Sequence, residues 1–123
     1  MRVLIVDDDS TTAELTAECL MLDPGVSART AGDGATALRA LAEFDPHVIL
    51  LALELPDEPG LQLAPRFKEM NPERAPRIIV FTGSAQGDGR SLPNGIDAWL
   101  TKPVNLDTLL DCISRPAGGE KML

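Results

Sequence analysis

Residues 2–9 read Arg2-Val3-Leu4-Ile5-Val6-Asp7-Asp8-Asp9, an apolar run that ends abruptly in three carboxylates. A short apolar run without alternation is typical of a strand buried on both faces, as in a parallel sheet. Ser10 or Asp9 can cap a helix that continues to about residue 22. We expect its apolar face to combine two sets of side chains, which are Ala13, Ala17 and Leu20, and Leu15, Cys19 and Leu22.

The remaining sequence continues to alternate between strand and helix patterns. Further strands are expected at 26–31, 47–53, 77–82 and 96–100, and helices at 35–44, from Gly60 to about 70, and at 105–114. Residues 83–95 carry four glycines and Pro93, so any helix there is short or irregular. The alternation predicts one α/β domain, a doubly wound parallel sheet of five strands with helices on both faces. We expect the domain to cover 1–115 and residues 116–123 to form a flexible tail.

Composition and charge exclude several classes of function. The net charge is −8 and no basic stripe is present, which argues against direct nucleic-acid binding. No apolar run approaches the roughly 20 residues that span a membrane. Residues 1–7 become acidic too soon for a signal peptide. Cys19 and Cys112 lack metal-ligand spacing, so we expect buried, reduced thiols in a cytoplasmic protein.

The polar residues that follow the strands indicate the site, because ligands of such sheets bind beyond the carboxyl ends of the strands. Carboxylate oxygens suit a hard cation such as Mg²⁺, while a hydroxyl and an ammonium group suit the oxygens of a phosphoryl group. The pattern predicts a site that handles phosphate, built from these residues at the ends of four strands: Asp7, Asp8, Ala52, Glu54, Thr82 and Lys102.

Four segments, read in order along nearly the whole chain, resemble the bacterial two-component response-regulator receiver domain, of the chemotaxis-regulator type. They are residues 3–9, 46–56 with Gly60, 79–83 and 99–103. The resemblance implies a flavodoxin-like sheet with strand order 2-1-3-4-5 and a signalling protein that is not an enzyme. It also implies partners: a sensor histidine kinase or a histidine phosphotransfer protein, and a downstream protein target or output domain.

The resemblance also assigns roles to single residues. Asp7 and Asp8 would form the acid pocket for Mg²⁺, and the backbone carbonyl of Glu54 would be a third metal ligand. Thr82 and Lys102 would contact the phosphoryl group. Trp99 would be an aromatic switch that moves inward with Thr82, and a cis peptide bond between Lys102 and Pro103 would hold the lysine in place.

The departure from the family pattern is at residue 52. The family's phosphate-accepting aspartate lies four residues before the proline and eight before the glycine of its third-strand loop, and here that position is Ala52. A methyl group can neither attack phosphorus nor ligate a metal. The resemblance therefore implies a receiver that cannot be phosphorylated and whose Mg²⁺ binding is weakened. Two origins stay open: an introduced substitution that fixes the unphosphorylated state, or a natural atypical receiver that acts by protein–protein interaction.

Two other functions fit parts of the sequence. Residues 7–11 match the DxDxT loop of haloacid-dehalogenase-like phosphatases, with Asp7 as nucleophile and Asp9 as general acid, and Thr82 and Lys102 fit their second and third motifs. Those enzymes need a further acidic pair at a strand end, whereas Asp107 and Asp111 fall on a predicted helix. A flavodoxin-like electron carrier is disfavoured because an acidic loop would repel the flavin phosphate and tyrosine is absent. His47, at the opposite end of its strand, is expected to be structural.

Overall fold

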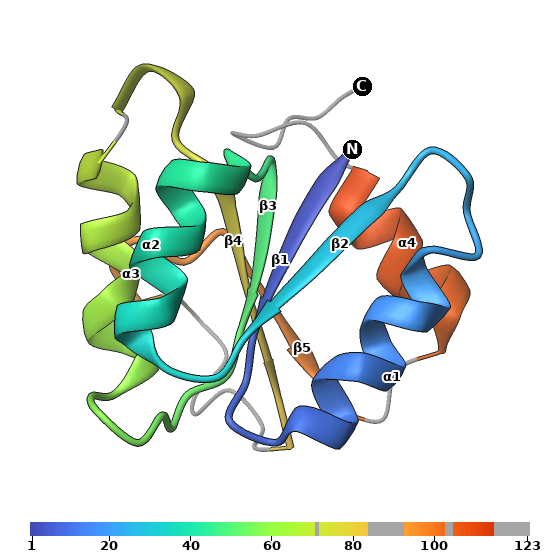
Figure 1. Ribbon diagram of the computed structural model, residues 1–123, viewed down its shortest axis with the longest axis horizontal. Coiled ribbons are helices and arrows are strands. Elements are labelled where there is room, and N and C mark those ends of the chain that lie inside the picture. The colour runs from blue at the N-terminus through green and yellow to red at the C-terminus, as the bar shows by residue number, and fades with distance from the viewer. Residues whose placement is uncertain (71, 84–92, 103–104, 115–123) are drawn as a thin grey trace.

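The computed structural model describes residues 1–70, 72–83, 93–102 and 105–114. Strands and helices alternate over residues 2–82, and the described elements that follow are a fifth strand and a last helix (Figure 1). The elements are β1 (Arg2–Val6), α1 (Ser10–Leu20), β2 (Ser27–Ala31), α2 (Gly34–Phe44), β3 (Val48–Leu51), α3 (Gly60–Met70), the 3₁₀ turn η1 (Pro72–Arg74), β4 (Arg77–Thr82), β5 (Ala98–Thr101) and α4 (Leu106–Ser114). All four strand pairings are parallel, in the order β2-β1-β3-β4-β5. The predicted fold class and strand order are confirmed.

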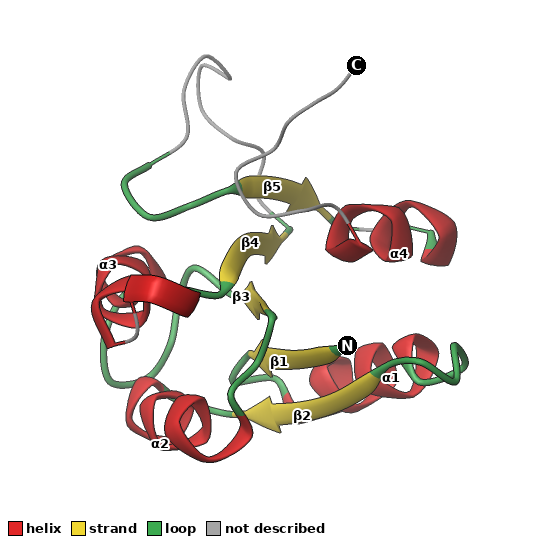
Figure 2. Cartoon of the chain, turned by 90° about the horizontal axis from the view of Figure 1, so that it is seen from above, coloured by secondary structure: helices red, strands yellow, loops and turns green. Residues whose placement is uncertain are grey.

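Helices cover both faces of the sheet. Figure 2 shows α2 and α3 on one side of the strands and α1 and α4 on the other. Successive side chains of β1 alternate between the two layers, so that Leu4 and Val6 join the core under α2 and α3, and Val3 and Ile5 join the core under α1 and α4. This two-sided burial explains why the central strands are uniformly apolar.

The register of the sheet places the site residues at one edge. Val6 pairs with Leu51, and Leu51 pairs with Val80. The backbone N–H of Ala52 then donates to the carbonyl oxygen of Val6 at 2.9 Å, and that of Lys102 donates to Thr82 at 2.7 Å. These bonds extend the parallel ladders past the strand ends, so the residues that follow β1, β3, β4 and β5 are held side by side.

The prediction for α1 was wrong in part. The helix ends at Leu20, and its buried residues are Ala13, Ala17 and Leu20. The second predicted set is exposed: Leu15 is 58% and Leu22 is 74% accessible, and Cys19 is exposed as well. In a helix, residues two apart point about 200° away from each other, so only one of the two sets can pack on the sheet. Neither cysteine forms a disulfide, and Cys112 is buried whereas Cys19 is exposed, so the expectation of a buried thiol fails for Cys19.

Smaller differences concern the ends of the strands. β3 begins one residue later and ends two residues earlier than expected, and β5 covers Ala98–Thr101 instead of 96–100. The predictions for the cis bond to Pro103, for the tail 116–123 and for most of 83–95 lie outside the described residues. In the described ranges, no helix has the length and apolar character needed to cross a bilayer.

Candidate functional site

A cleft of about 300 Å³ opens at the carboxyl edge of the sheet. It brings together most of the residues that the sequence placed at the strand ends, although they come from four separate strands. Its lining comprises Asp7 and Asp9, Ala52, Leu53 and Glu54, Phe81, Thr82 and Gly83, and Lys102. A polar cleft with these side chains can hold a small charged group at its mouth.

An ion pair between Asp7 and Lys102 fixes the centre of this cleft. The Lys102 Nζ lies 3.1 Å from Oδ2 of Asp7, and Asp7 is only 8% exposed. The other carboxylate oxygen, Oδ1, accepts the backbone N–H of Asp9 at 3.0 Å. Lys102 Nζ also lies 5.0 Å from the centre of the Phe81 ring, within range of a cation–π contact. The ammonium group is therefore held by a carboxylate and an aromatic face.

Phe81 was not predicted as a site residue. Its side chain belongs to the core under α1 and α4, as its position in the apolar run of β4 implies. The sequence signal that could have identified it is its place directly before Thr82, at the end of a strand that lines the cleft.

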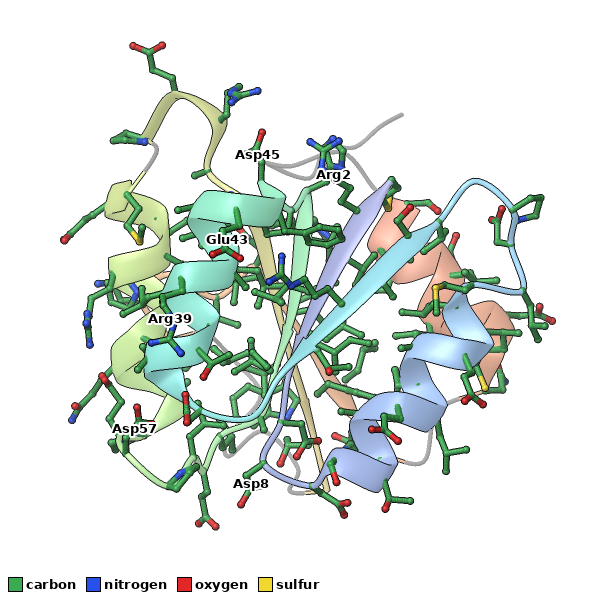
Figure 3. All side chains as sticks on the ribbon, viewed as in Figure 1. Arg2, Asp8, Arg39, Glu43, Asp45 and Asp57 are labelled. Carbon is green, nitrogen blue, oxygen red and sulfur yellow. The ribbon has the colours of Figure 1, made fainter. Side chains whose placement is uncertain are left out.

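The other two aspartates of the acidic turn differ from Asp7. Asp8 is exposed and does not line the cleft; Figure 3 shows it at the carboxyl end of β1. Asp9 lines the cleft, but its Oδ1 accepts the backbone N–H of Thr12 at 3.2 Å and so caps α1. That backbone hydrogen bond holds the pKa of the Asp9 carboxyl below its ordinary value. A general acid must be protonated near neutral pH, so this environment does not suit the phosphatase alternative.

Ala52 follows β3 directly and lines the cleft beside Asp7 and Lys102. Its backbone packs tightly against the start of α3, since a Cβ added to Gly60 would meet the carbonyl oxygen of Ala52. The N–H of Gly60 donates to the carbonyl of Leu53 at 2.6 Å, and Glu54 forms an isolated bridge with Pro59. The loop after β3 thus folds back on itself. Residue 60 is glycine because any side chain there would clash with the backbone of Ala52.

Thr82 and Trp99 occupy different positions relative to the cleft. Thr82 ends β4, pairs in register with Thr101 and lines the cleft. Trp99 lies in β5 opposite Val80 and packs, half-buried, against the core under α2 and α3. The structure places its side chain beside that core and outside the residues that line the cleft.

The oxygen donors near the cleft are those that a hard cation prefers. They are the carboxylates of Asp7 and Asp8 and the backbone carbonyl of Glu54, while the third strand offers a methyl group at Ala52. No cluster of three or more histidine, cysteine, aspartate or glutamate side chains able to hold a metal occurs in the described part of the chain. These donors are of the kind that Mg²⁺ prefers, and residue 52 adds no side-chain oxygen to them.

The sequence assigned Asp57 only to a loop, and the structure gives its carboxylate a definite contact. Asp57, between β3 and α3, accepts the backbone N–H of Gly34 at 2.9 Å and that of Ala35 at 3.1 Å. Figure 3 shows it near the first turn of α2. The hydrogen bond from Gly34 lowers the pKa of the Asp57 carboxyl. Asp57 therefore ties the loop that follows Ala52 to the amino terminus of a different helix.

The chain is similar to receiver proteins in both sequence and structure. It is 30% identical over 110 residues to the probable transcriptional regulatory protein TcrX of Mycobacterium tuberculosis, a match that covers 89% of this chain and 47% of TcrX. A solved CheY-like receiver domain from Methanospirillum hungatei superposes with a TM-score of 0.79 at 31% identity, covering 91% of this chain and 89% of that one. The response regulator TrrA of Thermotoga maritima, solved in complex with Mg(2+)-BeF, gives a TM-score of 0.77 at 25% identity and covers 91% and 95%.

Other curated relatives are sensor histidine kinases, of which this chain spans a small part, 11% for RcsC of Salmonella typhimurium. The chain thus spans about half or less of the length of these curated relatives. The family model described as the response regulator receiver domain matches residues 3–114. The chain belongs to the response regulator receiver domain family.

Proposed function

We propose that this chain is a phosphorelay receiver that is not phosphorylated at residue 52 and that acts in its unphosphorylated form through protein–protein interaction, without enzymatic activity. One observation carries the proposal. Ala52 follows β3 directly and lines the same cleft as the Asp7–Lys102 ion pair and Thr82. Residue 52 therefore occupies the position from which a side-chain nucleophile would face the phosphoryl group, and it offers a methyl group there.

The remaining side chains suit the binding of a phosphate-like anion and a divalent cation. Lys102 and Thr82 would hold phosphoryl oxygens through an ammonium and a hydroxyl group. Asp7, Asp8 and the Glu54 carbonyl would hold Mg²⁺, which neutralises negative charge when it is bound. Because the carboxylate at residue 52 is missing, we expect weaker Mg²⁺ binding than in a receiver with aspartate there. The Mg(2+)-BeF complex of TrrA supports the choice of cation for this fold.

The surface of α1 suggests how a partner would approach. A partner that recognises the unphosphorylated cleft would also meet α1, which begins beside it, since Asp9 both lines the cleft and caps the helix. The exposed side of α1 presents Leu15 and Cys19, and the exposed Leu22 follows just beyond the end of the helix. No lysine or arginine occurs between residues 3 and 28, and Glu14 and Glu18 flank the apolar side chains. A partner of matching chemistry has an apolar contact surface with a basic rim.

The partners that we propose are a sensor histidine kinase or a histidine phosphotransfer protein, and a downstream protein target or output domain. The kinases among the relatives support the first of these. The net charge of −8 argues against nucleic acid as a direct partner. We further propose that the domain works in the cytoplasm, where such partners would meet it.

The test compares the native chain with Ala52→Asp, each treated with acetyl phosphate or beryllofluoride and Mg²⁺. We expect Trp99 fluorescence and intact mass to change only for Ala52→Asp, and Ala52→Asn, which lacks a nucleophile, to behave like the native chain. Phosphorylation of the native chain would refute the proposal. Hydrolysis of an aryl phosphate by the native chain, abolished by Asp7→Asn, would instead favour the phosphatase.

A further inference from the structure

A second hollow lies at the opposite end of the sheet from the cleft. It measures about 370 Å³ and sits at the amino ends of β1, β3 and β4. Figure 3 shows Arg2 and Asp45 at this end and Asp8 at the other. The cleft and this hollow therefore belong to different edges of the sheet, and nothing in the proposed function uses the hollow.

Three guanidinium groups line this hollow, although the chain as a whole is strongly acidic. Arg2 comes from β1, Arg74 from η1 and Arg77 from β4, and the one carboxylate among the lining residues is Asp45. Three arginines against one aspartate give a formal excess of +2, in a chain with a net charge of −8. The positive charge is thus concentrated at this place.

The carboxylate of Asp45 forms ion pairs with two of these arginines, and both pairs are partly exposed and weak. Its Oδ2 lies 3.5 Å from Arg2 and 3.1 Å from Arg74, and the Arg74 side chain is 70% exposed. Exposed ion pairs of this kind contribute little to stability, so Arg74 can turn toward another anion at small cost.

Arg77 is the buried member of the group, with 7% exposure. Its guanidinium donates to the carbonyl oxygen of Cys112 in the last turn of α4 at 3.0 Å. A helix carboxyl terminus offers a partial negative charge, but no carboxylate of the described residues lies within ion-pair distance of Arg77. A buried guanidinium that donates to a helix terminus, which carries only a partial negative charge, would be stabilised further by a bound anion.

We propose that this hollow binds a small organic phosphate monoester. Arg2, Arg74 and Arg77 reach the hollow from three elements, and a guanidinium group matches the oxygens of a phosphate because it can donate two parallel hydrogen bonds. Pro46, Val48 and Ile113 give the hollow an apolar wall for the organic part of the ligand. The volume is at the lower end of the range found for small-molecule sites, which limits the ligand to a compact one.

The test titrates phenyl phosphate, inorganic phosphate and benzyl alcohol into the metal-free full chain and follows backbone amide shifts by NMR. We expect saturable binding of phenyl phosphate, with shifts at the amides of residues 45, 47, 48, 74, 75 and 77, weaker binding of inorganic phosphate and none of the alcohol. Arg74→Gln should weaken binding about fivefold, because it removes one charged donor. Asp45→Asn should tighten binding, since it removes the competing carboxylate at a position where asparagine accepts the same backbone conformation, φ 50°.

The matched control is Arg39→Gln, which removes an exposed arginine of α2 that donates to Oγ1 of Thr36 at 3.3 Å. It should leave binding unchanged. Shifts centred on the cleft, equal weakening by Arg39→Gln and Arg74→Gln, or no saturable binding of phenyl phosphate would overturn the proposal. None of these outcomes depends on whether residue 52 can be phosphorylated.

Discussion

The ammonium group of Lys102 lies 3.1 Å from Oδ2 of Asp7, although the two residues are 95 positions apart in the chain. The carboxylate is buried, and its second oxygen is occupied by the N–H of Asp9. The pair joins the ends of β1 and β5, which are not neighbours in the sheet, across the cleft that also contains Ala52.

Removal of the lysine charge tests whether this pair stabilises the fold. Lys102→Met should leave the buried Asp7 carboxylate with the backbone N–H of Asp9 and without the ammonium group. In the absence of metal, we expect the free energy of unfolding to fall by about 1–3 kcal/mol. Arg29→Met is the matched control, because the Arg29–Glu43 pair is exposed on both sides and should contribute less than about 1 kcal/mol. Urea denaturation measures the free energy of unfolding of both variants. Equal losses would show that the Asp7–Lys102 pair stabilises the fold no more than the exposed Arg29–Glu43 pair.

Introduction of the missing carboxylate tests the charge balance of the cleft. Ala52→Asp adds a negative charge beside Asp7, and like charges in a partly shielded site repel by about 1 kcal/mol or more. We expect a lower melting temperature than for the native chain in a chelating buffer, and recovery on addition of Mg²⁺. Asn at residue 52 is the isosteric control and should show neither effect. A melting series in which Mg²⁺ stabilises both variants equally would contradict the proposed metal site.

The sequence predicted the central strands and the grouping of the cleft residues for a common reason. Strands buried on both faces must be uniformly apolar, and the carboxyl ends of parallel strands meet at one edge. Asp7, Thr82 and Lys102 could therefore be placed together before any coordinates were known. Asp8 comes one residue after Asp7, two residues beyond the end of β1 at Val6, and its side chain is exposed.

Features that depend on tertiary contacts could not be predicted in the same way. The sequence of α1 contains two apolar sets, and periodicity does not decide which one meets the sheet; the set with Leu15 and Leu22 stays exposed. The hydrogen bonds from Gly34 and Ala35 to Asp57 join residues 23 and 22 positions apart, and local sequence patterns carry no signal for such a contact. The contact between Lys102 and Phe81 was missed for the same reason.

The close approach between α3 and the loop after β3 is tested by a methyl group at Gly60. A Cβ at this position would meet the backbone carbonyl of Ala52, which cannot move without disturbing the cleft. We expect Gly60→Ala to lower the free energy of unfolding by about 1–3 kcal/mol, despite the better helix propensity of alanine. Gly32→Ala meets nothing within 4 Å and should change it by less than about 0.5 kcal/mol. Similar free energies of unfolding for the two variants would mean that the loop after β3 moves to accept the methyl group without a loss of stability.

The last prediction concerns the acid dependence of the contact between Asp57 and α2. The backbone N–H of Gly34 holds the pKa of Asp57 below its ordinary value of 3.8 in the folded chain. A carboxyl with a lowered folded pKa stabilises the fold above its unfolded pKa, and this stabilisation is lost as the pH falls through the folded pKa. Asp57→Asn should therefore melt at a lower temperature than the native chain at pH about 6, and the difference should shrink as the pH approaches about 3.

Two further measurements separate this effect from general acid unfolding. Glu69→Gln neutralises an exposed carboxylate on α3 and should give no such pH-dependent difference. In the native chain, the amide protons of Gly34 and Ala35 should titrate with a midpoint below 3.8, because both donate to this carboxylate. If their midpoint lies at or above that value, the carboxylate does not cap α2 in solution, and the loop after Ala52 is not anchored to that helix.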